Sequence, residues 1–101
     1  IVKTGLAVEL PPNTELQVRA RSGHAKNGLL VANAPGTVDP DYRGPIGVLV
    51  YNSTETWINI EEGERFAQFV ISKKLPYDLV EVEELNGYTF LEVAILDIIV
   101  L

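Results

Sequence analysis

The chain has 101 residues, 47% of them hydrophobic and 22% charged, and its 8 basic and 14 acidic side chains give a formal net charge of −6. A chain of this length predicts one domain, residues 1–101, that gains stability from self-association. The absence of cysteine excludes a disulfide framework, and the single histidine, His24, excludes a two-histidine metal site. A metal ion would therefore have to arrive with the substrate or bind to carboxylates.

The sequence contains no recognisable targeting or membrane-spanning segment. Its apolar runs are shorter than the roughly 18 residues that a transmembrane helix needs. Residues 1–10 carry Lys3 and Glu9 without the plan of a signal peptide. We therefore expect a cytoplasmic or otherwise intracellular protein with no membrane partner. Ile1 in place of methionine indicates that the natural start lies upstream.

The acidic excess is concentrated at one end of the chain. The acidic residues after Leu75 have no lysine or arginine among them and account for the whole net charge: Asp78, Glu81, Glu83, Glu84, Glu92 and Asp97. Arg19, Arg21 and Lys26 lie instead in a stretch, 16–38, that has no acidic residue. An anionic ligand would bind there, unless the stretch is simply a solvated basic face. So few basic residues predict no nucleic-acid partner.

Apolar and polar residues alternate along most of the chain, which is the period of a half-buried strand. The alternation predicts strands at residues 6–10, 16–20, 29–33, 46–51, 56–60, 65–71 and 80–85. Glycine, proline or asparagine separates most of these segments, and Pro11-Pro12-Asn13 is a turn signal. Several short strands joined by turns predict an all-β fold, either a barrel or a sandwich.

Residues 86–101 form an atypical apolar tail. A helical stripe could be formed by Leu91, Ala94, Ile95, Ile98 and Ile99. Isoleucine and valine dominate residues 90–101, however, and β-branched residues favour strands over helices. We therefore expect a strand there, paired inside an oligomer, because an exposed apolar strand would aggregate.

Arg21-Ser22-Gly23 follows the predicted strand 16–20 and has the composition of an anion site. Arg21 supplies a cationic fork, Ser22 a hydroxyl, and Gly23 a backbone that an anion can approach closely. The triplet predicts a phosphate cradle, although the same residue types also occur in ordinary turns.

Residues 33–44 lie between two predicted strands and contain Asp39 and Tyr42. A carboxylate such as that of Asp39 can accept a proton from water, and the ring of Tyr42 offers a flat surface for a sugar or a base. The alternative interpretation is a Pro-Asp turn with a capping carboxylate.

These segments occur in order with a third one, and together they resemble the motifs of the trimeric dUTPase family. Residues 21–23 resemble its second motif, residues 36–44 (Gly-Thr-Val-Asp-Pro-Asp-Tyr-Arg-Gly) its third, and residues 63–70 (Gly-Glu-Arg-Phe-Ala-Gln-Phe-Val) its fourth. Residues 3–8 and 80–85 are typical of its connecting strands, so the resemblance covers 1–85. It implies an all-β, jelly-roll-like sandwich or β-barrel, a homotrimer, and hydrolysis of dUTP to dUMP and pyrophosphate at subunit interfaces. Mg²⁺ would bind through the substrate triphosphate, with no metal ligands from the protein.

The resemblance also implies roles for individual residues. Asp39 would be the catalytic residue that orients and deprotonates the attacking water. Tyr42 would stack on the deoxyribose and exclude a 2′-hydroxyl. The remaining substrate-binding residues would hold the uracil edge through main-chain groups (Asn33, Thr37, Val38 and Gly47) and the phosphates (Arg21, Ser22, Gly23 and Gln68).

Two features of the family are missing from the sequence. The first motif, Ala-Gly-x-Asp-Leu, is absent, and so is the glycine-rich C-terminal arm that forms the fifth. Residues 93–97 resemble the family's first strand, as in a truncated, rearranged or engineered member. We therefore expect weak turnover, with a catalytically impaired trimeric β scaffold or nucleotide-binding module as the alternative. A deoxynucleotide deaminase fits the third motif less well, and His24 is expected to be structural.

Overall fold

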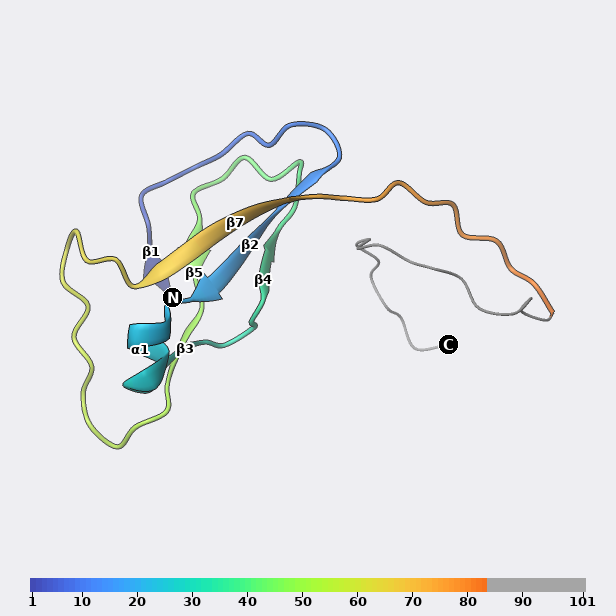
Figure 1. Ribbon diagram of the computed structural model, residues 1–101. Coiled ribbons are helices and arrows are strands. Elements are labelled where there is room, and N and C mark those ends of the chain that lie inside the picture. Colours follow the sequence, from blue (N-terminus) through green and yellow to red (C-terminus); the bar gives the residue numbers. More distant parts are fainter. Residues whose placement is uncertain (84–101) are drawn as a thin grey trace.

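The computed structural model describes residues 1–83, in which nearly all of the regular structure is β-strand (Figure 1). The elements are β1 (Val2–Lys3), β2 (Thr14–Ala20), α1 (Ser22–Lys26), β3 (Leu29–Val31), β4 (Gly36–Val38), β5 (Gly47–Val48), β6 (Val50–Asn52) and β7 (Ala67–Lys73). The all-β prediction is confirmed for this part of the chain. The strand expected at 90–101 lies outside the described residues.

The strand β2 is the centre of the largest sheet, whose antiparallel order is β4-β2-β7. In this sheet Leu16 lies opposite Val38 on one side and Ile71 on the other. Two smaller antiparallel pairs, β1-β5 and β3-β6, complete the described structure. Figure 1 shows β2 and β7 running side by side through the middle of the body.

The core lies against one face of the β4-β2-β7 sheet. Leu16 and Val18 alternate with Gln17 and Arg19 along β2, so the apolar side chains point to one side, where both are at most 5% exposed. The buried cluster draws on most of the other strands and their connections: Leu10, Leu16, Val18, Val31, Val38, Ile46 and Val48. This packing fixes the positions of β4 and β7, which carry the residues of the third and fourth motifs.

Two predicted strands, 6–10 and 56–60, are absent from the structure. Alternation indicates which side chains share a face, but a strand also needs a neighbour for its backbone groups. The first segment is joined to residue 46 by one backbone hydrogen bond, from the Ile46 N–H to the Leu6 carbonyl at 2.8 Å. The second lies in a long loop between β6 and β7, where Trp57 is 96% exposed.

Other differences concern lengths and local turns. The predicted strand 46–51 is divided into β5 and β6, and the one at 65–71 begins two residues later, at Ala67. The helix α1 was not predicted, because five residues are too few to show helical periodicity. After β7 the chain runs away from the body, and residues 80–83 form no strand, with Val80 75% exposed (Figure 1).

Within residues 1–83, no helix is both long enough and apolar enough to cross a membrane.

Candidate functional site

The predicted phosphate-binding residues lie at the end of β2. Arg21 follows this strand in an extended conformation, with φ −86° and ψ 140°, and Ser22 and Gly23 open α1. Ser22 and Gly23 are exposed, and no atom lies within 4 Å of the place where a side chain on Gly23 would begin. The backbone of this turn is therefore accessible from solvent.

Gln68 on β7 is brought to the same end of the sheet. It lies opposite Arg19 in the β2-β7 register, and its Nε2 donates a hydrogen bond to the carbonyl oxygen of Ala20 at 2.9 Å. Arg21 and Gln68 both line one cavity of about 650 Å³ between β1, β5 and the chain that leads into β7. The fold thus joins residues of the second and fourth motifs, 47 positions apart.

The wall of this cavity has a mixed charge. Its basic side chains are Lys3, Arg21 and Arg65, and its acidic ones, Glu61, Glu62 and Glu64, come from the loop before β7. His24 Nε2 lies 3.8 Å from Glu64 Oε2, with both side chains about one-third exposed or less. The pair joins α1 to the loop of the fourth motif, which agrees with a structural role for His24.

The predicted uracil-binding residues line a second, smaller cavity of about 80 Å³. Asn33, Thr37, Val38 and Gly47 all contribute to it. The strand β4 is at the edge of its sheet, paired only with β2, so its outer backbone groups are outside the sheet's hydrogen-bond ladder. Such groups can pair with the amide-like edge of a pyrimidine.

Asp39 and Tyr42 lie in the loop that follows β4. The Tyr42 N–H donates to the Asp39 carbonyl at 3.0 Å, which closes a turn, and the Arg43 guanidinium donates to the Pro40 carbonyl at 2.6 Å. Both Asp39 and Tyr42 are exposed. The turn expected from Pro-Asp is therefore present, and it presents the carboxylate and the ring to solvent.

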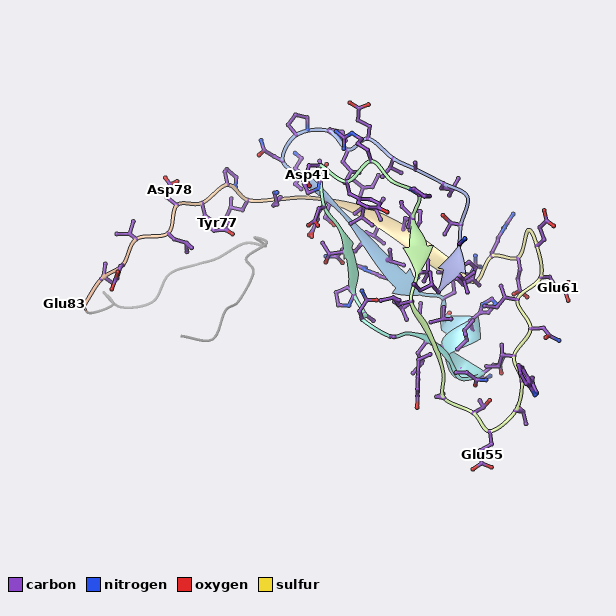
Figure 2. All side chains as sticks on the ribbon, turned by 180° about the vertical axis from the view of Figure 1, so that it is seen from behind. Asp41, Glu55, Glu61, Tyr77, Asp78 and Glu83 are labelled. Carbon is purple, nitrogen blue, oxygen red and sulfur yellow. The ribbon has the colours of Figure 1, made fainter. Side chains whose placement is uncertain are left out.

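Asp39 and Arg21 lie at opposite ends of β2. Because Leu16 pairs with Val38, Asp39 is level with Glu15, whereas Arg21 lies beyond Ala20. Six residues of extended chain separate these levels, which is about 20 Å. Figure 2 shows the same separation: Asp41, in the loop of Asp39, and Glu61, in the wall of the larger cavity, lie on opposite sides of the body. In one chain Asp39 and Arg21 are therefore far apart, whereas the smaller cavity lies beside Val18 in β2 and shares Val48 with the larger one.

The described residues contain no group of three or more histidine or acidic side chains that could hold a metal ion.

Comparison with known proteins identifies the family. The sequence model of the dUTPase family matches residues 1–95, ten residues beyond the resemblance seen in the motifs. A deoxyuridine 5′-triphosphate nucleotidohydrolase of Cytophaga hutchinsonii is 53% identical over 87 residues, which are 85% of this chain and 56% of that protein. One of Crocosphaera subtropica is 48% identical over 87 residues, or 85% and 61%. The chain belongs to the dUTPase family, and it spans about three fifths of the length of these relatives.

Solved structures confirm the fold. A mutant dUTPase of Staphylococcus bacteriophage 80alpha, with dUpNHpp, matches with a TM-score of 0.74 and 25% identity, over 86% of this chain and 67% of that one. The native EIAV dUTPase matches with a TM-score of 0.64 and 32% identity, over 79% and 69%. The predicted dUTPase-like β fold is therefore correct.

Sequence reasoning missed two contacts near these residues. The His24–Glu64 pair and the packing of Tyr42 over Gly44 both depend on how loops fold back. Gly44 is visible in the sequence as the glycine after Tyr42-Arg43, but nothing in the sequence indicates that the Tyr42 ring packs against it.

Proposed function

We propose that this protein hydrolyses dUTP to dUMP and pyrophosphate, in sites shared between three copies of the chain, inside the cell. The observation that carries the proposal is that one chain holds two half-sites, with Asp39 at one end of β2 and Arg21 beyond the other. The half-site near β4 and β5 has the backbone edge and small cavity that suit a pyrimidine. The half-site near Arg21 and Gln68 has the cationic and amide groups that suit phosphates.

A shared site follows from the distance between Asp39 and Arg21 in one chain. Asp39 would activate the water that attacks the α-phosphorus, while Arg21 would hold phosphate oxygens of the same molecule. These residues are about 20 Å apart along β2 in one chain, by the rise of an extended strand. A closed cyclic trimer would bring Asp39 of one copy to Arg21 of the next, because a head-to-tail interface joins two different surfaces. The resemblance to trimeric dUTPases supports the number three.

The proposed chemistry needs little from the protein beyond position and charge. The Asp39 carboxylate accepts a proton from water, whose oxygen forms a bond to the α-phosphorus as the bond to the bridging oxygen breaks. The leaving group is pyrophosphate and the product is dUMP. Tyr42 would lie against the deoxyribose, and main-chain groups of Thr37 and Val38 would pair with uracil.

We propose that Mg²⁺ enters as an ion carried by the triphosphate. When bound, it would neutralise phosphate charge and orient the leaving group. Arg21 and Ser22 would hold the phosphate oxygens that the ion leaves free.

The alternative is a trimeric scaffold or nucleotide-binding module of the same ancestry. Neither the first motif nor the glycine-rich arm occurs in the printed sequence, and losing a positioning carboxylate and a closing segment costs pre-organisation. We therefore expect slow turnover by these 101 residues. Binding of dUMP without turnover would favour the alternative.

Pyrophosphate release from dUTP with Mg²⁺ tests the proposal, beside dTTP, dCTP and UTP. We expect release from dUTP alone, and its loss in Asp39→Asn. Glu55→Gln removes the same charge from an exposed loop outside both half-sites, so it should leave the rate unchanged (Figure 2). Equal background release from all four nucleotides would overturn the proposed function.

A further inference from the structure

The loop after β4 holds the Tyr42 ring in a folded-back position. The ring hydroxyl donates a hydrogen bond to the main-chain carbonyl of Pro45 at 2.8 Å. At the other end of the residue, the Tyr42 N–H is bonded to the Asp39 carbonyl at 3.0 Å. The side chain therefore crosses over Gly44, which lies between Tyr42 and Pro45.

Gly44 leaves the space that the ring occupies. A Cβ on Gly44 would lie 2.7 Å from the Tyr42 hydroxyl oxygen, 2.9 Å from Cζ and 3.3 Å from Cε2. Real Cβ atoms essentially never approach another heavy atom within 3.0 Å. Any other residue at position 44 would therefore displace the ring from this position.

The backbone conformation does not itself require glycine here. Gly5, Gly28 and Gly63 have positive φ angles, but Gly44 does not. An alanine could adopt the backbone of residue 44 without left-handed strain. The contact with Tyr42 is thus the observed reason for a glycine at this position.

The core does not hold the ring. Tyr42 is 45% exposed and is not part of the buried cluster, unlike Val38 at the start of the same loop. Its position depends on the local contacts with Gly44 and Pro45. A substitution that displaces the ring should therefore cost little stability, because the ring can swing into solvent.

We propose that Gly44, together with the Pro45 carbonyl, is a specificity-determining positioning element: it fixes the Tyr42 ring at the height where it admits deoxyribose and rejects ribose. This inference rests on the proposed function, in which Tyr42 lies against the sugar. A ring held at both ends presents a fixed face, and a 2′-hydroxyl would have to push it away. A mobile ring would yield to that hydroxyl.

The test is a double-mutant cycle on the full chain, with the dUTP-to-UTP ratio of kcat/KM as the readout. Gly44→Ala should lower this ratio about tenfold, the size of a lost aromatic contact, while the unfolding midpoint stays close to that of the parent protein. Tyr42→Ala should lower the ratio at least as far. In the Tyr42→Ala background, Gly44→Ala should have no further effect, because no ring remains to be displaced.

Two kinetic outcomes would overturn the inference. One is an unchanged ratio in Gly44→Ala, and the other is a fall of equal size with and without the Tyr42 ring. A crystal structure of Gly44→Ala separates this inference from the proposed function. Absence of dUTP activity in the parent protein would contradict the proposed function. A Tyr42 ring that is still bonded to the Pro45 carbonyl in Gly44→Ala would contradict the positioning role of Gly44, whatever the activity.

Discussion

The side-chain amide of Gln68 donates a hydrogen bond to the main-chain carbonyl of Ala20 at 2.9 Å, so β7 is joined to the end of β2 beside Arg21. Because the amide nitrogen faces the Ala20 carbonyl, the amide oxygen of Gln68 points away from it. It also sets the position of the amide in the larger cavity. The proposed phosphate half-site is therefore assembled by a contact between two strands.

Gln68→Glu should reduce kcat/KM for dUTP about tenfold or more. A carboxylate cannot donate to the Ala20 carbonyl and would repel both it and the substrate phosphates. Steady-state pyrophosphate release measures the effect. The unfolding midpoint should change little, since Gln68 is exposed. Full activity in this variant would contradict the position proposed for Gln68.

Arg21→Lys should weaken binding of the triphosphate more than binding of deoxyuridine. Lysine keeps the charge but loses the planar fork that holds two phosphate oxygens at once. Calorimetric titrations with a non-hydrolysable dUTP analogue and with deoxyuridine give the comparison. An equal loss for both ligands would mean that Arg21 acts on the fold and not on phosphate.

Mixed trimers test the shared site directly. Asp39→Asn and Arg21→Ala should each be inactive alone, but chains that are mixed in equal amounts and assembled together should recover about one quarter of the parent activity. In randomly assembled trimers, half of the interfaces receive an intact Asp39 from one chain, and half receive an intact Arg21 from the next chain. An active site needs both, so about one quarter of the interfaces are active. Absence of recovery in assembled hybrids would place the whole site in one chain. Sedimentation of the parent protein as a monomer would also exclude a site shared between chains.

Leu16→Ala should destabilise the protein by about 2–5 kcal/mol, because truncating a buried leucine removes apolar contacts and leaves a cavity. Leu16 is 1% exposed and lies between Val38 and Ile71 in the central sheet. Leu30→Ala is the matched control, since Leu30 is 37% exposed and should cost about 1 kcal/mol or less. Denaturant unfolding of both variants measures the difference.

His24→Gln should leave dUTP turnover within about twofold and stability within about 1 kcal/mol, as expected for a contact between two partly exposed polar side chains. His24 and Glu64 are 3.8 Å apart, with side-chain exposures of 27% and 34%. Pyrophosphate release across pH 6–8 would reveal any dependence on the imidazole. A large loss of turnover would show that His24 does more than join α1 to the neighbouring loop.

Much of the fold was predictable because the information is local. Along β2, Leu16 and Val18 alternate with Gln17 and Arg19, and this period alone predicts a strand and its buried face. The motifs around Arg21, Asp39 and Gln68 were likewise visible as short segments. Each segment indicates chemistry through its residue types, whatever lies near it in space.

The sequence by itself determined the all-β class, the family resemblance and the residue types of the two half-sites. Only the tertiary structure decided which alternating segments find a partner: 6–10 and 56–60 do not, because strand pairing depends on backbone groups from distant parts of the chain. It also decided that Gln68 bonds to Ala20 and lines the same cavity as Arg21, that Asp39 lies at the other end of β2, and that Tyr42 lies over Gly44. These relationships follow from register and packing, which local periodicity does not specify.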